Sequence, residues 1–267
     1  MFLRLLKQDL RATGRVMVVL YAVVLVLAGA TRLMTEFMDK DVGGVLVMIF
    51  ARMLTVLFVV AIAACVVMTF VLMIIRFYKN FLTDEGYLMF TLPVTKGQLI
   101  WSKLLVSLVW VFASGVIGIL VGFIMSVGTD AQDVLFDFGW LREMFNYFTT
   151  GQNVLLVFLA IAAVVLWSSY TYLKCYAAMA VGQSFGTHKF LISVAFYIAF
   201  GIVERIITFA LLSPILTMSN LTEAVEDAKP FSILAGMLGS IDGFYFVLCA
   251  VYFVLTYMFF RKKLNLQ

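Results

Sequence analysis

Residues 76–103 read RFYKNFLTDEGYLMFTLPVTKGQLIWSK, a polar interruption between two apolar runs, 54–75 and 104–129. Neither run contains a charged residue, and each is long enough to cross a bilayer. The charges of the interruption are Arg76, Lys79, Lys96 and Lys103 against Asp84 and Glu85. Because cytoplasmic loops of membrane proteins carry an excess of Lys and Arg, we expect this loop to be cytoplasmic.

The same loop is unusually apolar between its charges. Its apolar side chains include Phe81, Tyr87, Leu88, Met89, Phe90 and Leu92. Thr83 or Asp84 can cap a short helix that Pro93 ends, and Thr95 can cap a second helix that leads into the next span. A short helix with projecting aromatic residues fits a groove on another protein. We therefore predict a cytoplasmic helix that docks a soluble partner through Asp84, Glu85, Gly86, Tyr87, Phe90 and Pro93.

The composition extends this interpretation to the whole chain. Of the 267 residues, 64% are hydrophobic and 13% charged, which leaves too little polar side chain to cover a water-soluble globule. The fold class predicted is an all-α integral membrane protein. The formal net charge of +4 is explained by an excess of cations on the cytoplasmic side, so it does not indicate nucleic-acid binding.

Six apolar segments predict six transmembrane helices. They run over residues 16–33, 45–75, 104–128, 153–179, 190–212 and 243–260. Most of the 19 Lys and Arg fall in the segments placed inside, and most of the 15 acids fall in those placed outside, 35–44, 129–152 and 213–242. This bias predicts that both termini are cytoplasmic and that the chain is a multi-pass protein of the cell membrane.

Three further expectations complete the topology. Residues 1–15 form a basic amphipathic helix that should lie in the membrane interface, ahead of the six-span domain 16–267. Lys174 should mark the inner end of the fourth span. The outer segment 213–242 contains an apolar stretch, residues 231–240, with Pro214 and Pro230 as helix breakers, and it could form short helices that dip into the outer leaflet.

The sequence lacks two common enzyme motifs. It contains no phosphate-cradling G-x-x-x-x-G-K-[ST] loop and no H-E-x-x-H, and its single histidine, His188, falls in a short loop. Cys65, Cys175 and Cys249 lie in apolar runs without metal-ligand spacing, so we expect small core residues. Ser168 and Ser169 should bond to the backbone of their own helix or pack against another. We predict no catalytic, cofactor-binding or metal-binding residues in this chain.

Besides Arg32 and Lys174, which we place at the ends of spans, three charges fall within predicted spans, namely Arg52, Glu204 and Arg205. A charge at membrane depth is costly unless it is paired or reaches water. One interpretation makes the three a polar patch on a substrate path. The other is a structural pair between Glu204 and Arg52, with Arg205 extended toward the outer interface.

The loop and its flanking spans resemble the membrane subunits of ABC-2-type transporters. The residues that carry the resemblance are Glu85-Gly86, Leu92-Pro93-Val94-Thr95 and Lys103 at the head of the third span. The order of elements is similar too: a basic amphipathic helix, six spans and a long outer segment before the last span. The family often has a basic residue directly after the acid, where this chain has Gly86 and Tyr87.

The resemblance implies a permease subunit of a bacterial ABC exporter in the plasma membrane. It implies as partners a separate ATP-binding subunit, which holds the ATP and Mg²⁺, and a second membrane subunit, identical or homologous. The loop would then hold the coupling helix that receives the motion of the ATPase. Two alternatives stay open from the residues alone: a membrane adaptor or sensor that docks a cytosolic protein, and an autonomous carrier.

Overall fold

The computed structural model describes residues 2–39, 44–82, 94–127, 146, 151–185, 189–217 and 230–262. All regular secondary structure within these ranges is helical, and six of the helices are long and apolar enough to cross a membrane. The prediction of an all-α chain with six candidate spans is confirmed for this part of the sequence. The helices indicate a multi-pass membrane protein, and the sidedness of the termini stays a prediction from the charge pattern.

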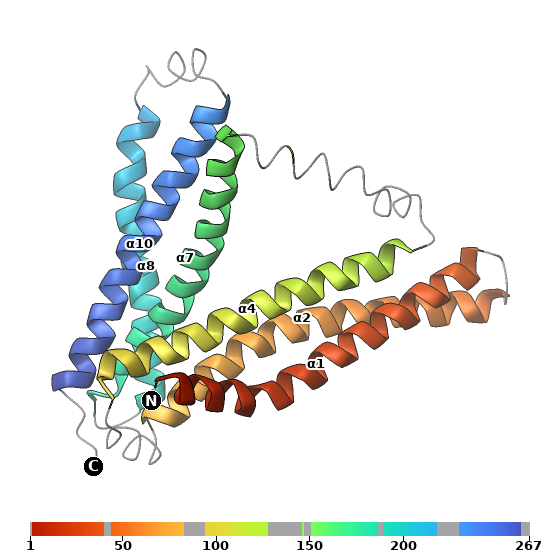
Figure 1. Ribbon diagram of the computed structural model, residues 1–267, viewed down its shortest axis with the longest axis horizontal. Helices are drawn as coiled ribbons and strands as arrows, with labels where there is room; N and C mark the ends of the chain where they lie inside the picture. The colour runs from red at the N-terminus through yellow and green to blue at the C-terminus, as the bar shows by residue number, and fades with distance from the viewer. Residues whose placement is uncertain are drawn as a thin grey trace. The chain divides into compact units, whose positions relative to one another are not determined.

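The helices in chain order are α1 (Phe2–Asp39), α2 (Gly44–Leu82), α4 (Lys96–Ser126), α7 (Gly151–Gly182), α8 (Lys189–Thr217) and α10 (Pro230–Lys262) (Figure 1). The longest, α2, has 39 residues and is about 58 Å long at 1.5 Å per residue, against about 30 Å of hydrocarbon in a bilayer. Large apolar side chains are exposed along every helix; examples are Val26, Val59, Ile119, Phe158, Phe209 and Phe246. Such exposure suits helices surrounded by lipid, because lipid tails are as apolar as these side chains.

Close contacts divide the chain into two units. Unit 1 contains Met1–Ile75 and Leu105–Asn146, and unit 2 contains Arg76–Leu104 and Tyr147–Gln267. The boundary falls within α2 and within α4, so the ends of these two helices that flank the predicted coupling loop belong to unit 2, together with α7, α8 and α10.

In unit 1, α1 and α4 are joined by neutral hydrogen bonds. The indole Nε1 of Trp110 donates to Thr13 Oγ1 at 2.8 Å, and the hydroxyls of Tyr21 and Ser114 lie 2.8 Å apart. Near the other end of the pair, the guanidinium of Arg32 donates to the carbonyl oxygen of Val127, the residue that follows α4. A cation is favourable there because the last carbonyls of a helix lack partners within the helix.

The structure corrects several predicted boundaries. Residues 2–15 are helical as expected, but they continue into the first span as one helix, α1, with no end at residue 15. The helix α2 extends seven residues past Ile75 to Leu82, and α8 continues through Pro214 to Thr217. The apolar residues 231–240 belong to α10, which starts at Pro230. Proline is compatible with the first turn of a helix, because the first turn's N–H groups have no partner within the helix.

The start of α4 agrees with the predicted cap. The side-chain oxygen of Thr95 accepts a hydrogen bond from the backbone N–H of Gln98 at 3.3 Å, and Gln98 Oε1 accepts one from the backbone N–H of Thr95 at 3.2 Å. This reciprocal pair is a capping box, which satisfies two backbone donors that the helix itself cannot pair. It fixes the point where the chain enters α4.

Unit 2 is built around α7. This helix packs against both α8 and α10, and the three form a bundle (Figure 1). Every residue from 172 to 182 is buried. Burial on all sides of a helix is the signature of a central position. Small residues in this stretch, among them Ala177, Ala178 and Ala180, permit close approach of the neighbouring backbones.

Candidate functional site

The predicted docking residues lie outside the part of the chain that the structure describes. They are Asp84, Glu85, Gly86, Tyr87, Phe90 and Pro93. Their docking role therefore stays a prediction. His188 also falls outside the described ranges.

The helix ends on either side of that loop are anchored in unit 2 by an aromatic cluster of Phe77, Phe81, Tyr176 and Phe260. The ring of Phe77 stacks on Tyr176 with 3.8 Å between centroids, and Phe81 lies 4.9 Å from Phe77 and 5.3 Å from Phe260. All four side chains are at most 2% exposed. The cluster joins the end of α2 to the last turns of α7 and α10.

Two lysines at the start of α4 add to this anchoring. Lys96 Nζ donates to the carbonyl oxygen of Phe260 at 2.6 Å, close to the end of α10. The ammonium of Lys103 lies 5.9 Å from the ring centroid of Phe81, within the range of a cation–π contact. The prediction that Phe81 belongs to the cytoplasmic loop is wrong: it is a buried residue of α2, where its ring packs in the aromatic cluster.

The main polar feature of unit 2 is a buried ion pair between Lys174 of α7 and Glu204 of α8. Lys174 Nζ lies 2.5 Å from Glu204 Oε2, and the two side chains are only 8% and 11% exposed. Both residues lie inside apolar segments that are candidate membrane spans. A pair this well buried gains strong attraction, because the surroundings screen it weakly.

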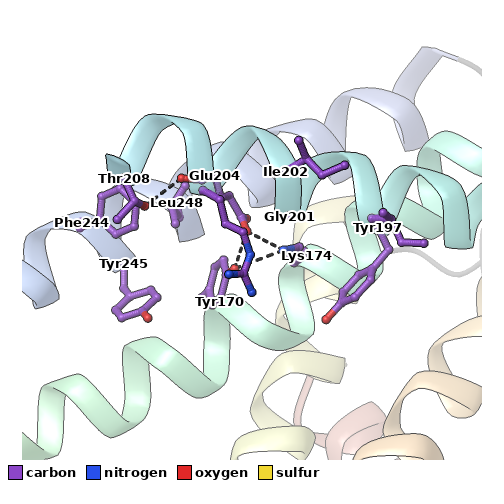
Figure 2. A pocket seen from close by; sticks show the side chains of 12 residues that line it. Tyr170, Lys174, Tyr197, Gly201, Ile202, Glu204, Thr208, Phe244, Tyr245 and Leu248 are labelled. Carbon is purple, nitrogen blue, oxygen red and sulfur yellow. Dashed lines mark hydrogen bonds and ion pairs between the residues drawn. The ribbon is translucent and has the colours of Figure 1, made fainter. Parts of the chain in front are cut away.

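Two tyrosine hydroxyls complete the surroundings of the carboxylate. Tyr170 donates to Glu204 Oε2 at 2.7 Å, and Tyr252 of α10 donates to Glu204 Oε1. Tyr170 also accepts a hydrogen bond from Lys174 Nζ at 3.3 Å. Figure 2 shows Glu204, Lys174 and Tyr170 directed toward one another from α8 and α7. Both carboxylate oxygens are thus occupied by donors, and the three helices of the bundle meet at Glu204.

This geometry overturns one prediction. The structural partner of Glu204 is Lys174, not Arg52. Lys174 is buried eight residues before Gly182, the last residue of α7, and forms the ion pair; its place at the inner end of the span stays a prediction. Its long apolar stem lets the ammonium reach a carboxylate on the neighbouring helix.

A cavity of about 460 Å³ lies beside the ion pair, within unit 2. The described residues that line it are Tyr170, Lys174, Tyr197, Ile198, Gly201, Ile202, Glu204, Arg205, Thr208, Phe244, Tyr245 and Leu248 (Figure 2). A methyl group added at Gly201 would lie 3.3 Å from Lys174 Nζ, so the glycine leaves room for the ammonium beneath α8. The walls combine aromatic rings with a few polar groups, as small-molecule sites do.

The two arginines predicted within spans differ in position. Arg205 follows Glu204 on α8, is exposed and lines the cavity. It makes no hydrogen bond or ion pair to any residue that the structure describes. Arg52 is an exposed residue of α2 in unit 1 and is not among the lining residues.

The sequence analysis did not identify Tyr170 and Tyr252, nor the pairing of Lys174 with Glu204. One local signal was available: Tyr170 and Lys174 are four residues apart inside an apolar run, so they lie on the same face of a helix. A lysine with a hydroxyl one turn away indicates a polar face directed at another helix. The position of Tyr252, on a different helix, carries no such signal.

The smaller predictions on sulfur and hydroxyl groups hold where the structure describes them. Cys65 and Cys175 are buried, and Cys249 is half-buried with its thiol 3.5 Å from the carbonyl oxygen of Leu166. Ser168 and Ser169 donate to the carbonyl oxygens of Val164 and Val165, four residues earlier in α7. These residues therefore act in packing and in local bonding.

Comparison with family models, with curated proteins and with solved structures finds no significant match.

Proposed function

We propose that this chain is the membrane subunit of an ATP-driven exporter. In this proposal it pairs with a second membrane subunit and docks a separate ATP-binding subunit through the loop around Tyr87 and Phe90. ATP and Mg²⁺ are bound by that partner. The proposal joins the resemblance of residues 85–103 to ABC-2-type subunits with six helices that can cross a membrane.

One structural observation supports the proposal most. The helix ends on both sides of the loop, Arg76–Leu82 and Lys96–Leu104, belong to the same compact unit as the cavity. At the end of α2, the ring of Phe81 contacts the ring of Phe260 in α10. At the start of α4, Lys96 Nζ donates to the carbonyl oxygen of the same Phe260. Because packed side chains move together rather than deform, a displacement of the loop would pass directly to the bundle of α7, α8 and α10.

The energy for transport would come from the partner. A conformational change at the loop alters the cavity only if the partner binds the two arrangements of the bundle with different affinity. ATP binding and hydrolysis in the partner would supply that difference.

An autonomous carrier is the second candidate, and the ion pair is the observation that favours it. Ionisable residues within spans often serve as relays in pumps and carriers, and Lys174, Glu204, Tyr170 and Tyr252 form a connected network. This candidate predicts flux through vesicles that contain the chain alone, without ATP.

The test is gentle purification of the tagged full-length chain, followed by an assay of ATP hydrolysis in the complex. We expect a soluble ATPase at fixed stoichiometry, and we expect the double variant Tyr87→Ala/Phe90→Ala to lose it while still inserting into the membrane. The matched control is Phe158→Ala/Phe209→Ala, which removes two aromatic rings that are 67% and 75% exposed on α7 and α8. This control should retain the ATPase.

Two outcomes decide against the proposal. A chain that purifies alone and supports ATP-independent flux is a carrier. A constant partner without ATPase activity makes the chain an adaptor. If the ATPase binds equally to the double variant and to the control, the subunit assignment stands but the docking role of Tyr87 and Phe90 is wrong.

A further inference from the structure

We propose that the cavity beside Lys174 and Glu204 binds an amphiphile with an anionic head, a carboxylate or a phosphate, and that Arg205 is the residue that holds this head. As a binding site the cavity can be tested on the chain alone. Only the further statement, that the ligand of this cavity is the transported substrate, rests on the proposed function above.

The charge balance of the cavity favours an anion over a cation. Two cations, Lys174 and Arg205, line it against one carboxylate, Glu204. Both oxygens of that carboxylate already accept hydrogen bonds, from Lys174, Tyr170 and Tyr252. The charge of Glu204 is balanced by Lys174 in the ion pair, so among the lining residues the charge without a counter-ion is that of Arg205.

The position of Arg205 strengthens the argument. It lies within the apolar stretch Lys189–Leu211, where a charged side chain costs several kcal/mol in a membrane unless it finds a partner or water. Among the residues that the structure describes it has no such partner. An anion in the cavity would supply one, and the planar guanidinium can bind a carboxylate or phosphate with two parallel hydrogen bonds.

The walls of the cavity indicate what the rest of the ligand must be. Beside the charged groups stand aromatic rings of Tyr197, Phe244 and Tyr245 and the aliphatic side chains of Ile198, Ile202 and Leu248. Figure 2 shows Tyr197 and Tyr245 on opposite sides of Lys174 and Tyr170. The volume of about 460 Å³ falls within the usual range for small-molecule sites. Such walls suit an apolar or aromatic body attached to the anionic head.

The ion pair has a positioning role in this site. The ammonium of Lys174 lies 5.0 Å from the ring centroid of Tyr197 and 5.6 Å from that of Tyr170, so its charge fixes two of the aromatic walls by cation–π contacts. Asp242, a buried acid of α10, is not among the lining residues.

The experiment measures binding of cis-parinaric acid, a fluorescent fatty acid, to the full-length protein in nanodiscs of phosphatidylcholine. We expect saturable binding, and we expect Arg205→Gln to weaken it about tenfold or more, the usual effect of losing a hydrogen bond between charged groups. Arg52→Gln is the matched control, since it removes an exposed arginine that does not line the cavity. It should leave the affinity unchanged.

A second series of nanodiscs contains phosphatidylglycerol and distinguishes two sources of the anionic head. If phosphatidylglycerol competes with the probe in the wild type but not in Arg205→Gln, the site takes an anionic lipid. If the probe binds equally in both kinds of nanodisc, the site takes a smaller carboxylate amphiphile. Both outcomes support the proposal.

Other outcomes overturn it. Equal loss of affinity in Arg205→Gln and Arg52→Gln would mean that surface charge alone attracts the probe. No loss in Arg205→Gln, or tighter binding of dodecyltrimethylammonium than of the fatty acid, would exclude an anion site at Arg205. A change of oligomeric state without a change of affinity would assign Arg205 to contact with a second subunit. None of these readings needs the ATPase, so failure here is distinct from failure of the exporter assignment.

Discussion

The two units of the chain use polar groups in different ways. In unit 1, α1 and α4 are joined by neutral side chains, Trp110 to Thr13 and Tyr21 to Ser114, and by one arginine that bonds to a backbone carbonyl. In unit 2, α7, α8 and α10 meet at a buried ion pair beside a cavity, and two tyrosine hydroxyls donate to the carboxylate of that pair.

The two kinds of polar contact differ in the free energy that it costs to bury them. Neutral hydrogen bonds hold helices together at small desolvation cost. A buried ion pair is poor evidence for stability, because a well-packed apolar pair would often serve as well. Its position beside an aromatic cavity is the observation from which the proposed binding role starts.

Glu204→Gln should give the largest effect, because it leaves the ammonium of Lys174 buried without a counter-ion. Breaking one partner of a buried pair typically costs about 3–5 kcal/mol. We expect a clearly lower midpoint of thermal unfolding in detergent micelles. The measurement is the thermal midpoint of the purified variant against that of the wild type.

The double variant Lys174→Met/Glu204→Gln is the control for this change. Removing both charges should recover much of the lost stability, since no unpaired charge is left. If the double variant is as unstable as Glu204→Gln, the interaction in unit 2 is steric rather than ionic, and the contrast with unit 1 is lost.

Gly182→Ala should give an intermediate effect at the turn between α7 and α8 in unit 2. An added methyl group would lie 2.1 Å from Ser193 Oγ, 2.9 Å from the backbone nitrogen of Ser193 and 3.0 Å from the carbonyl oxygen of Lys189. Two of these atoms are backbone, which cannot move aside without shifting the helix, so we expect a loss of about 1–3 kcal/mol.

Gly118→Ala in α4 of unit 1 is the matched substitution. Nothing lies within 4 Å of the added methyl group at Gly118, nor at Gly122, one helical turn further on. We expect a midpoint equal to or slightly above that of the wild type, because alanine favours helix. A large loss in Gly118→Ala would show that this face contacts a second subunit.

Trp110→Phe should give the smallest loss. It removes the indole donor to Thr13 but keeps an aromatic ring between α1 and α4. Hydrogen bonds between helices of membrane proteins contribute about 0.6 kcal/mol on average. The measurement is the thermal midpoint, and the control variant is Trp101→Phe. Trp101 is a half-exposed residue of unit 2 whose ring contacts the ring of Phe253. A loss for Trp110→Phe as large as that for Glu204→Gln would remove the distinction between the units.

The sequence by itself determined the helical class, the six candidate spans and the start of α4. Apolar runs without charges can bury their backbone polar groups only by forming helices, and the capping pair of Thr95 and Gln98 is a local interaction readable from residues three apart. The back-bonded Ser168 and Ser169 were predictable for the same reason, since their partners lie one turn away.

Only the tertiary structure decided which charges meet and where the helices end. Hydrophobic periodicity cannot distinguish Lys174 at a membrane boundary from Lys174 paired across helices, because its flexible stem permits both. The same holds for the end of α2: residues 76–82 look like a charged loop in sequence, but Phe77 and Phe81 gain partners on α7 and α10 that are far away in the chain. Contacts between distant segments, and the cavity that these segments line, come from packing that no local pattern encodes.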